Sequence, residues 1–412
     1  MRTLKQKVIL SLFLLFSLMI FPENAAGEIF EFKHTAGDRY RILSIVEEEV
    51  LVNRVVVLRA EILNRIAFEV TGITDGKARH KAVFQTSERP VKDGLSNTKN
   101  DNTGFVWSRE YESVFDLDKL GQITIEPHYF MPMVRNVPVF PGRDLKVGDK
   151  WYAPAHEVHD FRDTFEIEEP YKIPFNAFYE YVGEREWKNV SYPAFTVTYN
   201  IESRPEPVPG KIYPVRISGT YKQLVFWNRE LGQTIACEEQ FRVTFDVSDG
   251  RRIEFRGKAQ AEFVDSDEMD KEKIVTEIKE ELERQDIKNV EVKVVNDGIS
   301  LSLEDIKFYP DSDRMLPGEE EKLERIADIL KRYSNRDILV SGHAALAGSP
   351  DYLMELSEKR ARAVGDYLLA ENVRTPDRVV VRGFGALRPI ADNSTEEGMR
   401  KNRRVEITIL EN

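Results

Sequence analysis

Apolar side chains follow two different periods along this chain, and the change between them, near residue 265, constrains the fold more than any other feature. Before the change, residues 241–247 and 253–263 alternate apolar with polar side chains on either side of a turn at Gly250. A period of two with a glycine-containing turn between the runs indicates an antiparallel hairpin. We therefore expect residues 28–264 to consist mostly of strands.

The β-rich part is expected to contain one or two domains. A second hairpin is predicted around Gly76, and the sequence changes character near residue 150. This change predicts a first domain over residues 28–150, with residues 151–265 as a second domain or as a continuation of the first. Residues 131–150 and 161–188 are expected to form long irregular stretches.

After residue 265 the pattern becomes one of helices alternating with strands. Ser349 and Pro350 suit a helix start, because serine caps helix N-termini and proline is favoured at the first helical position. Helices are predicted at 270–284, 317–333 and 349–370, and strands at 290–295, 299–303, 338–341, 378–384 and 404–410. The fold class is therefore predicted to be α+β, with soluble antiparallel sheet first and an α/β sandwich after it.

The first 27 residues have the layout of a cleavable secretory signal. Three basic residues precede an apolar run at residues 8–21, and small residues follow at 25–27. The run is too short to cross a bilayer comfortably, since a spanning helix needs roughly 20 such residues. We therefore expect residues 1–27 to be removed on export and the mature chain to have no transmembrane helix. The expected location is the periplasm, with association to the outer membrane left open.

Cysteine content and charge exclude some structures and partners. The single cysteine, Cys237, cannot form an internal disulfide, and it lies far from the start of the mature chain, where a lipid anchor would need it. The formal net charge of −12 repels polyanions and argues against nucleic acid as a partner.

A short histidine motif is the strongest candidate for a metal site. His156 and His159 flank Glu157, but helical zinc proteases place two residues between the Glu and the second His, and no third ligand is indicated here. No phosphate-binding loop, nucleophile elbow or spaced carboxylate pair stands out either. We therefore expect no metal, no cofactor and no enzymatic activity.

Five segments near the C-terminus carry a recognisable pattern. They are Gly342-His343, Leu356-Ser357-Glu358-Lys359-Arg360-Ala361, Gly383-Phe384-Gly385, Pro389-Ile390-Ala391-Asp392-Asn393 and Asn402-Arg403-Arg404-Val405-Glu406-Ile407. Their order and spacing resemble the OmpA-like, peptidoglycan-associated family. The resemblance implies an OmpA-like domain, with a preceding helix and strand, over residues 266–412. It also implies noncovalent attachment to peptidoglycan.

In that family, an Asp and an Arg grip the diamino acid of the peptide stem, which carries an amino group and carboxylates. A guanidinium can hold a carboxylate through two parallel charge-assisted hydrogen bonds. Arg360 is the Arg of the motif, and helical counting places it on the apolar stripe of Leu356 and Val364. Because an isolated buried charge is very costly, Arg360 is predicted to point at something anionic. An internal salt bridge or a snorkelling stem is the alternative.

The Asp of the family pattern is absent. Its position is occupied by Ala345, whose side chain cannot pair with an ammonium. We therefore expect half of the ligand clamp to be missing and binding to isolated peptidoglycan to be weak or absent. Asp351 is a candidate replacement, and the resemblance implies Asn402 and Arg403 as further participants.

Three functions remain open. In the favoured one, a non-enzymatic envelope protein meets the peptide stem through its OmpA-like domain, while its β-rich region binds another ligand or envelope protein. In the second, the OmpA-like fold survives only as a scaffold for protein contacts. In the third, residues 28–264 form an outer-membrane barrel, against which the irregular stretches and uneven strand spacing argue.

Overall fold

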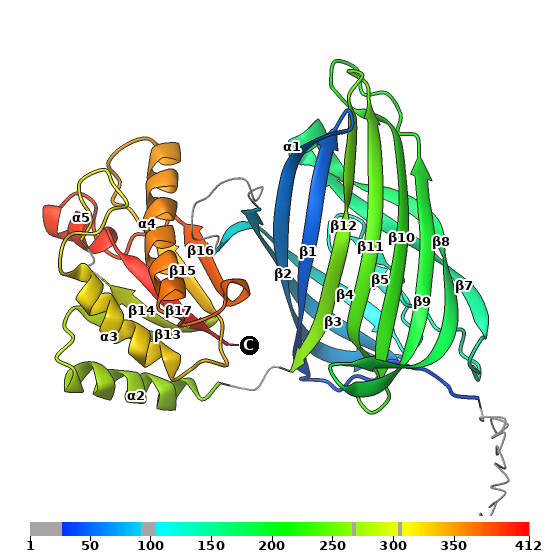
Figure 1. The fold of residues 1–412 in the computed structure, drawn as a ribbon, viewed down its shortest axis with the longest axis horizontal. Coiled ribbons are helices and arrows are strands. Elements are labelled where there is room, and N and C mark those ends of the chain that lie inside the picture. The colour runs from blue at the N-terminus through cyan, green and yellow to red at the C-terminus, as the bar shows by residue number, and fades with distance from the viewer. Residues whose placement is uncertain (1–26, 92–103, 266–268, 304–306, 412) are drawn as a thin grey trace, which may run out of the picture.

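The computed structural model describes residues 27–91, 104–265, 269–303 and 307–411. The predicted export signal therefore lies outside the described residues, except for Gly27. The rest of the chain is β-rich, as predicted, and its helices are concentrated after residue 265 (Figure 1). No helix within the described ranges is long and apolar enough to cross a membrane.

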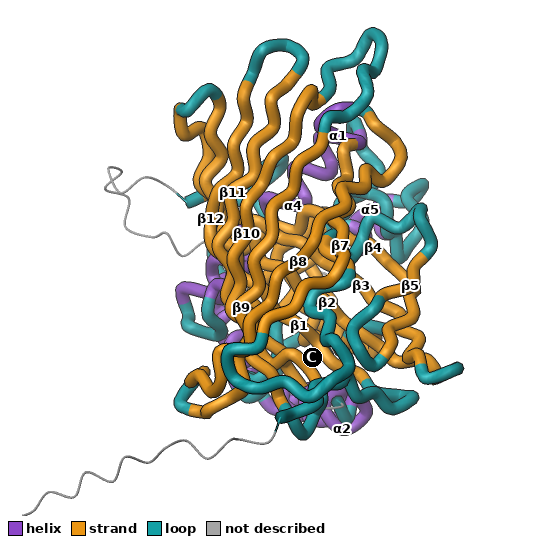
Figure 2. Tube along the Cα trace, turned by 90° about the vertical axis from the view of Figure 1, so that its right-hand side faces the viewer, coloured by secondary structure: helices purple, strands orange, loops and turns teal. Residues whose placement is uncertain are grey.

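A continuous run of antiparallel strands makes up the N-terminal region. On one side, strand β1 pairs with β2, and the sheet continues from β2 through β3 and β4 to β5. On its other side, β1 pairs with β12, and the sheet continues from β12 through β11, β10, β9 and β8 to β7. The elements are β1 (Arg39–Val52), β2 (Val55–Thr74), β3 (Lys77–Pro90), β4 (Phe105–Asp118), β5 (Ile123–Ile125), β6 (Val134–Arg135), β7 (Lys150–Phe161), α1 (Arg162–Phe165), β8 (Ile167–Trp187), β9 (Val190–Ser203), β10 (Pro214–Asn228), β11 (Gln233–Val247) and β12 (Arg252–Asp265). Figure 2 shows β7 to β12 running side by side. Because β1 pairs with β12, the strands before and after residue 150 are hydrogen-bonded into one curved sheet.

The two predicted hairpins are confirmed. Strands β2 and β3 are joined at Gly76, and β11 and β12 at Gly250, and both glycines adopt a positive φ. The prediction of an irregular stretch at 161–188 is wrong, because β8 fills most of it. Prolines and charged residues interrupt the alternation of apolar and polar side chains in this segment. The alternation becomes apparent only when the structure shows which side chains are buried in the sheet.

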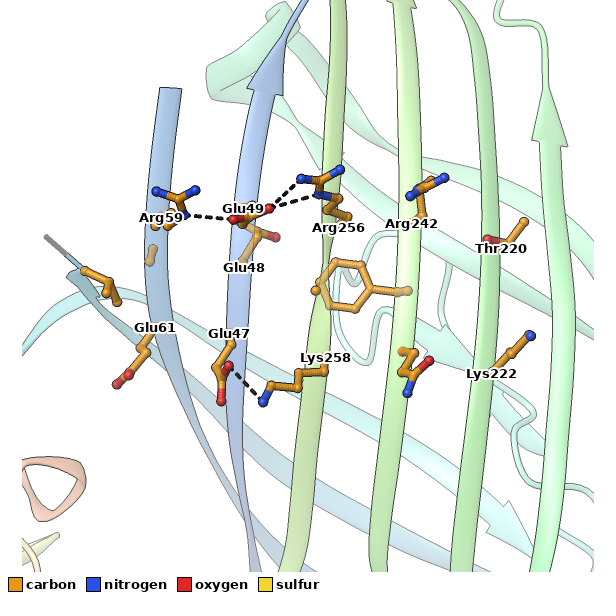
Figure 3. A pocket seen from close by; sticks show the side chains of 15 residues that line it. Glu47, Glu48, Glu49, Arg59, Glu61, Thr220, Lys222, Arg242, Arg256 and Lys258 are labelled. Atoms are coloured by element: carbon orange, nitrogen blue, oxygen red, sulfur yellow. Dashed lines mark hydrogen bonds and ion pairs between the residues drawn. The ribbon is translucent and has the colours of Figure 1, made fainter. Parts of the chain in front are cut away.

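The curved sheet has an aromatic inner face and a charged outer face. On the inner face, the rings of Phe175 and Tyr199 stack with centroids 4.2 Å apart, and those of Tyr199 and Tyr221 follow at 4.4 Å. On the outer face, Glu49 is bonded to Arg59 and Arg256 on the neighbouring strands (Figure 3). This alternation is the period of two seen in the sequence.

The C-terminal region is a second, smaller sheet with helices packed on it. The strand order is β13-β14-β17-β15-β16, in which only β15 and β16 are parallel. The elements are α2 (Lys271–Arg284), β13 (Val290–Val295), β14 (Gly298–Leu303), α3 (Glu319–Lys331), β15 (Ile338–Gly342), α4 (Pro350–Ala370), a 3-10 turn (Pro376–Arg378), β16 (Val379–Gly383), α5 (Glu396–Asn402) and β17 (Val405–Leu410). Leu323 of α3, Val364 of α4 and Ile407 of β17 are fully buried in one core.

The start of α4 follows the predicted capping chemistry. The Ser349 side chain accepts a hydrogen bond from the backbone N–H of Tyr352, and Pro350 occupies the first helical turn. The register of α4 is therefore fixed by its own sequence, and with it the direction in which Arg360 points.

Candidate functional site

A hollow of about 800 Å³ opens in the C-terminal region, where α4 faces the segment before α3 and the segment before β17. Its wall brings together residues from four parts of the chain. They include Asp311, His343, Ala345, Arg360, Arg403 and Arg404.

Helix α4 presents Arg360 to this hollow. The Nε of Arg360 donates to the carbonyl oxygen of Ser312 at 3.0 Å, and its guanidinium carbon lies 5.1 Å from the centre of the Phe308 ring. Within the described part of the chain, Arg360 forms no ion pair with a carboxylate, so the predicted alternative of an internal salt bridge is not formed there. Burial lowers the pKa of Arg360, but an arginine remains charged. The positive charge therefore faces the hollow.

Ala345 lies in the same wall of the hollow. Ala345 is only 3% exposed, and it follows β15 on the loop that bounds the hollow. The position that holds an acid in the family is therefore inside the hollow and carries a methyl group in this chain.

Arg404, which belongs to the motif at residues 402–407, is a buried cation of the hollow. Arg404 is 4% exposed, its Nε donates to Glu406 at 2.6 Å, and one Nη donates to the carbonyl oxygen of Arg388 at 3.2 Å. Its second Nη is buried and has no hydrogen-bond partner among the described residues. Its neighbour Arg403, which was predicted, also lines the hollow. A buried guanidinium with an unused donor favours an anionic ligand.

His343 also lines the hollow. It is 3% exposed, its Nε2 lies 3.6 Å from a carboxylate oxygen of Glu406, and its ring stacks on Phe384 with centroids 5.2 Å apart. Burial lowers the pKa of His343, so the imidazole is neutral at neutral pH. Most of the positive charge in the hollow therefore comes from arginines.

Asn402 and Asp351, which were also predicted, do not line the hollow. The Asn402 side chain is fully buried, accepts from the backbone N–H groups of Ile390 and Ala391, and donates to Ala391 and Asn393. It therefore holds the loop before α5 in shape. Asp351 is exposed on the first turn of α4.

An acid in the hollow comes from a place that sequence reasoning missed. Asp311 lies in the segment between β14 and α3, and its carboxylate accepts a hydrogen bond from the Tyr352 hydroxyl at 2.9 Å. The segment is closed by a hydrogen bond from the N–H of Leu316 to the carbonyl of Lys307 at 2.8 Å. The sequence Pro310-Asp311-Ser312 signals a turn, but nothing in it shows that the turn folds over α4.

The predicted histidine motif lies elsewhere, on β7. The His159 Nε2 is 2.9 Å from the carboxylate of the buried Glu157. Within the described ranges, no group of three or more His, Cys, Asp or Glu side chains is arranged to hold a metal ion.

The C-terminal region is similar to several known proteins. Residues 307–403 match the model of the OmpA family. The C-terminal region is an OmpA-like domain. The peptidoglycan-binding protein ArfA of Mycobacterium tuberculosis is 39% identical over 104 residues, which cover 25% of this chain and 32% of that protein. The outer membrane porin F of Pseudomonas aeruginosa is 38% identical over 105 residues, which cover 26% of this chain and 30% of that protein.

Two further matches each cover 29% of this chain. The probable lipoprotein YiaD of Escherichia coli is 36% identical over 121 residues, covering 29% of this chain and 55% of that protein. The structure of an outer membrane protein from Borrelia burgdorferi matches 29% of this chain and 96% of that chain at 41% identity, with a TM-score of 0.25. This chain spans about a third of the ArfA and porin F relatives and about half of YiaD.

Proposed function

We propose that this protein is a non-enzymatic component of the cell envelope whose OmpA-like domain associates with the peptide stem of peptidoglycan. The observation that carries the proposal is the hollow in which Arg360, Arg403 and Arg404 converge beside Ala345. A peptide stem offers several carboxylates, and guanidinium groups are the side chains best suited to hold them. The matched proteins named for peptidoglycan binding support the same ligand.

In this proposal, the carboxylate that pairs with the ammonium group of the diamino acid belongs to Asp311 and not to residue 345. Asp311 carries its charge into the same hollow as Arg360, and Tyr352 holds one of its oxygens. Because Asp311 is more exposed than a buried clamp residue, its contribution to an ammonium contact is screened by water. The expected affinity is therefore weak, in keeping with the loss of the usual acid.

A pull-down with purified, protein-free peptidoglycan tests the guanidinium. Arg360→Ala is expected to lower the bound fraction by at least about tenfold, since removing one partner of a charged hydrogen-bonded pair costs roughly 2 kcal/mol or more. Arg362→Ala is the matched control, because Arg362 lies on the same helix and pairs with Glu358. Strong wild-type binding that Arg360→Ala leaves unchanged would defeat the proposal.

A second comparison tests the acid. Ala345→Asp is expected to strengthen binding, and Asp311→Asn to weaken it, whereas Asp351→Asn is expected to have no effect. Free diaminopimelate, which carries both ammonium and carboxylate groups, should compete with peptidoglycan for the protein. It should compete less effectively for Asp311→Asn than for the wild type. Equal loss in Asp311→Asn and Asp351→Asn would show that Asp311 has no special role.

A second candidate function is a protein scaffold that has lost its wall ligand. The observation that favours it is the methyl group of Ala345 at the position of the family's acid. Absence of wild-type binding together with strong binding by Ala345→Asp would favour this function over the first.

The β-rich region is proposed to lie in the periplasm and to contact another ligand or envelope protein. A surface that faces lipid needs an apolar outer band. The outward side chains of β1 and β12 instead form ion pairs, such as Glu47 with Lys258 at 3.0 Å (Figure 3). Retention of the mature protein in solution without detergent is the expected result, and a requirement for detergent would contradict it.

A further inference from the structure

One edge of the OmpA-like sheet is occupied by the β-rich region. Strand β16 pairs in parallel with the start of β4, with Val380 opposite Phe105. Leu63 of β2 joins these two residues in a small apolar core, and all three are 1% exposed. The junction between the two regions therefore has an apolar core of its own.

A buried ion triad fixes the orientation at this junction. The Nε of Arg65, on β2, lies 3.1 Å from one carboxylate oxygen of Asp337, and the Nε of Arg378 lies 2.8 Å from the other. Arg65 is 4% exposed and Asp337 is 3% exposed. Rotating one region against the other would separate these charges in a buried place, which is strongly unfavourable.

A line of stacked side chains runs from the junction to the hollow. The guanidinium carbon of Arg382 lies 4.2 Å from the centre of a Trp107 ring on β4 and 4.6 Å from the centre of the Phe384 ring. Phe384 also stacks on His343, which lines the hollow, and the centre of its ring lies 3.9 Å from the guanidinium carbon of Arg388. Cation–π and ring-stacking contacts prefer defined geometries, so each member restricts the next.

Backbone hydrogen bonds attach the same line to the wall of the hollow. The N–H of Phe384 donates to the carbonyl of Gly342 at 2.9 Å, and the N–H of Ala344 donates to the carbonyl of Gly385 at 2.8 Å. The segment around Phe384 therefore cannot shift without moving residues 342–344. These residues are next to Ala345.

We propose that the β-rich region positions the ligand hollow of the OmpA-like domain, with Trp107 as a positioning residue that acts through Arg382, Phe384 and His343. The ligand of the hollow rests on the proposed function above, whereas the positioning itself does not. The partner that fits this edge of the OmpA-like domain is thus a segment of the same chain. Loss of the Trp107 ring is expected to loosen the wall that contains His343.

The binding experiment uses the full mature chain and purified peptidoglycan. Trp107→Ala is expected to weaken binding about threefold to tenfold, the size of a partly buried cation–π contact. Trp107→Phe, which keeps an aromatic face for Arg382, is expected to restore most of it. The matched control is Tyr152→Ala on the outer face of β7, where Tyr152 is 68% exposed and away from the junction. Equal binding by wild type and Trp107→Ala would overturn the proposal.

Arg382→Ala gives a second route to the same conclusion in case Trp107→Ala folds poorly. Because both residues act through one contact, the double variant is expected to bind no more weakly than the weaker of the two single variants. Additive losses would overturn the proposed line.

An NMR experiment separates this inference from the proposed ligand. His343 is the only one of the 6 histidines that lies after residue 265, and His343→Gln would assign its ring resonance. Trp107→Ala is expected to shift that resonance, and Tyr152→Ala to leave it in place. If wild type fails to bind peptidoglycan, the proposed function falls and the His343 resonance alone decides the inference. An unmoved resonance would refute it.

Discussion

The junction between the two regions and the interior of the curved sheet bury carboxylates in opposite ways. At the junction, Asp337 lies between the guanidinium groups of Arg65 and Arg378. Inside the sheet, Glu239 receives one hydrogen bond, from the amide of Gln223 at 3.0 Å, and the second carboxylate nearby, Glu157, repels it. The same chemical group is therefore compensated in one place and uncompensated in the other.

The pKa values follow this difference. Burial alone would raise the pKa of Asp337, but Arg65 and Arg378 outweigh it and the pKa falls below its usual range. Burial raises the pKa of Glu239 to about 7, and the charge of Glu157 adds to the effect. A compensated buried charge can specify how two regions dock, whereas an uncompensated one costs stability near neutral pH.

The largest expected effect on the free energy of unfolding comes from removing a cationic partner of the compensated carboxylate, Asp337. Arg65→Ala should destabilise the protein by about 3–5 kcal/mol, because it removes one of the two guanidinium groups that compensate the buried Asp337. Urea unfolding followed by circular dichroism measures this. Arg39→Ala is the control, since its ion pair with Glu69 is well exposed. A loss below about 1 kcal/mol would mean that the junction is hydrated.

The same junction should be sensitive to acid. Because the folded pKa of Asp337 is lowered, its contribution is fully present above the unfolded value of about 3.9 and is lost as pH falls through the folded pKa. On acidification, the wild type should lose the stability that the Arg65–Asp337 pair contributes, which Arg65→Ala already lacks. The two unfolding midpoints should therefore converge as the pH falls below about 4. Parallel curves over that range would contradict this account.

Neutralising the uncompensated charge should have the opposite sign. Glu239→Gln is expected to raise stability by roughly 1–3 kcal/mol at pH 8. Because the folded pKa of Glu239 is raised, wild type is most stable below about pH 4.3 on this account and loses stability as pH rises through about 7. The gain should therefore vanish near pH 4. The exposed neighbour Glu238→Gln serves as control, and a gain of equal size there would remove the explanation.

The smallest effect is expected on the outer face. Glu47 and Lys258 are 59% and 65% exposed, and such pairs contribute little because water screens them. Glu47→Gln should change the free energy of unfolding by no more than about 0.5 kcal/mol. A larger loss in thermal melts would indicate that the outer charges form a coupled network, and the contrast with the junction would weaken.

Local features of the fold were predictable because their signals lie within a few residues. The alternation around Gly250 specified a hairpin, and Ser349-Pro350 specified the start of α4. The placement of Arg360 on an apolar stripe followed from helical spacing alone. The strand at 167–187 was missed because its inward side chains are interrupted by charges and prolines, and only the opposing sheet face shows which of them are buried.

The sequence by itself determined the two-part organisation, the helix carrying Arg360 and the absence of an acid at Ala345, because each depends on spacing along the chain. The tertiary structure decided which groups share the hollow: it brought in Asp311 and excluded Asn402 and Asp351. It also decided that Arg65 meets Asp337, two residues far apart in the chain. Contacts of this kind depend on how separate surfaces fit together, and no local period encodes them.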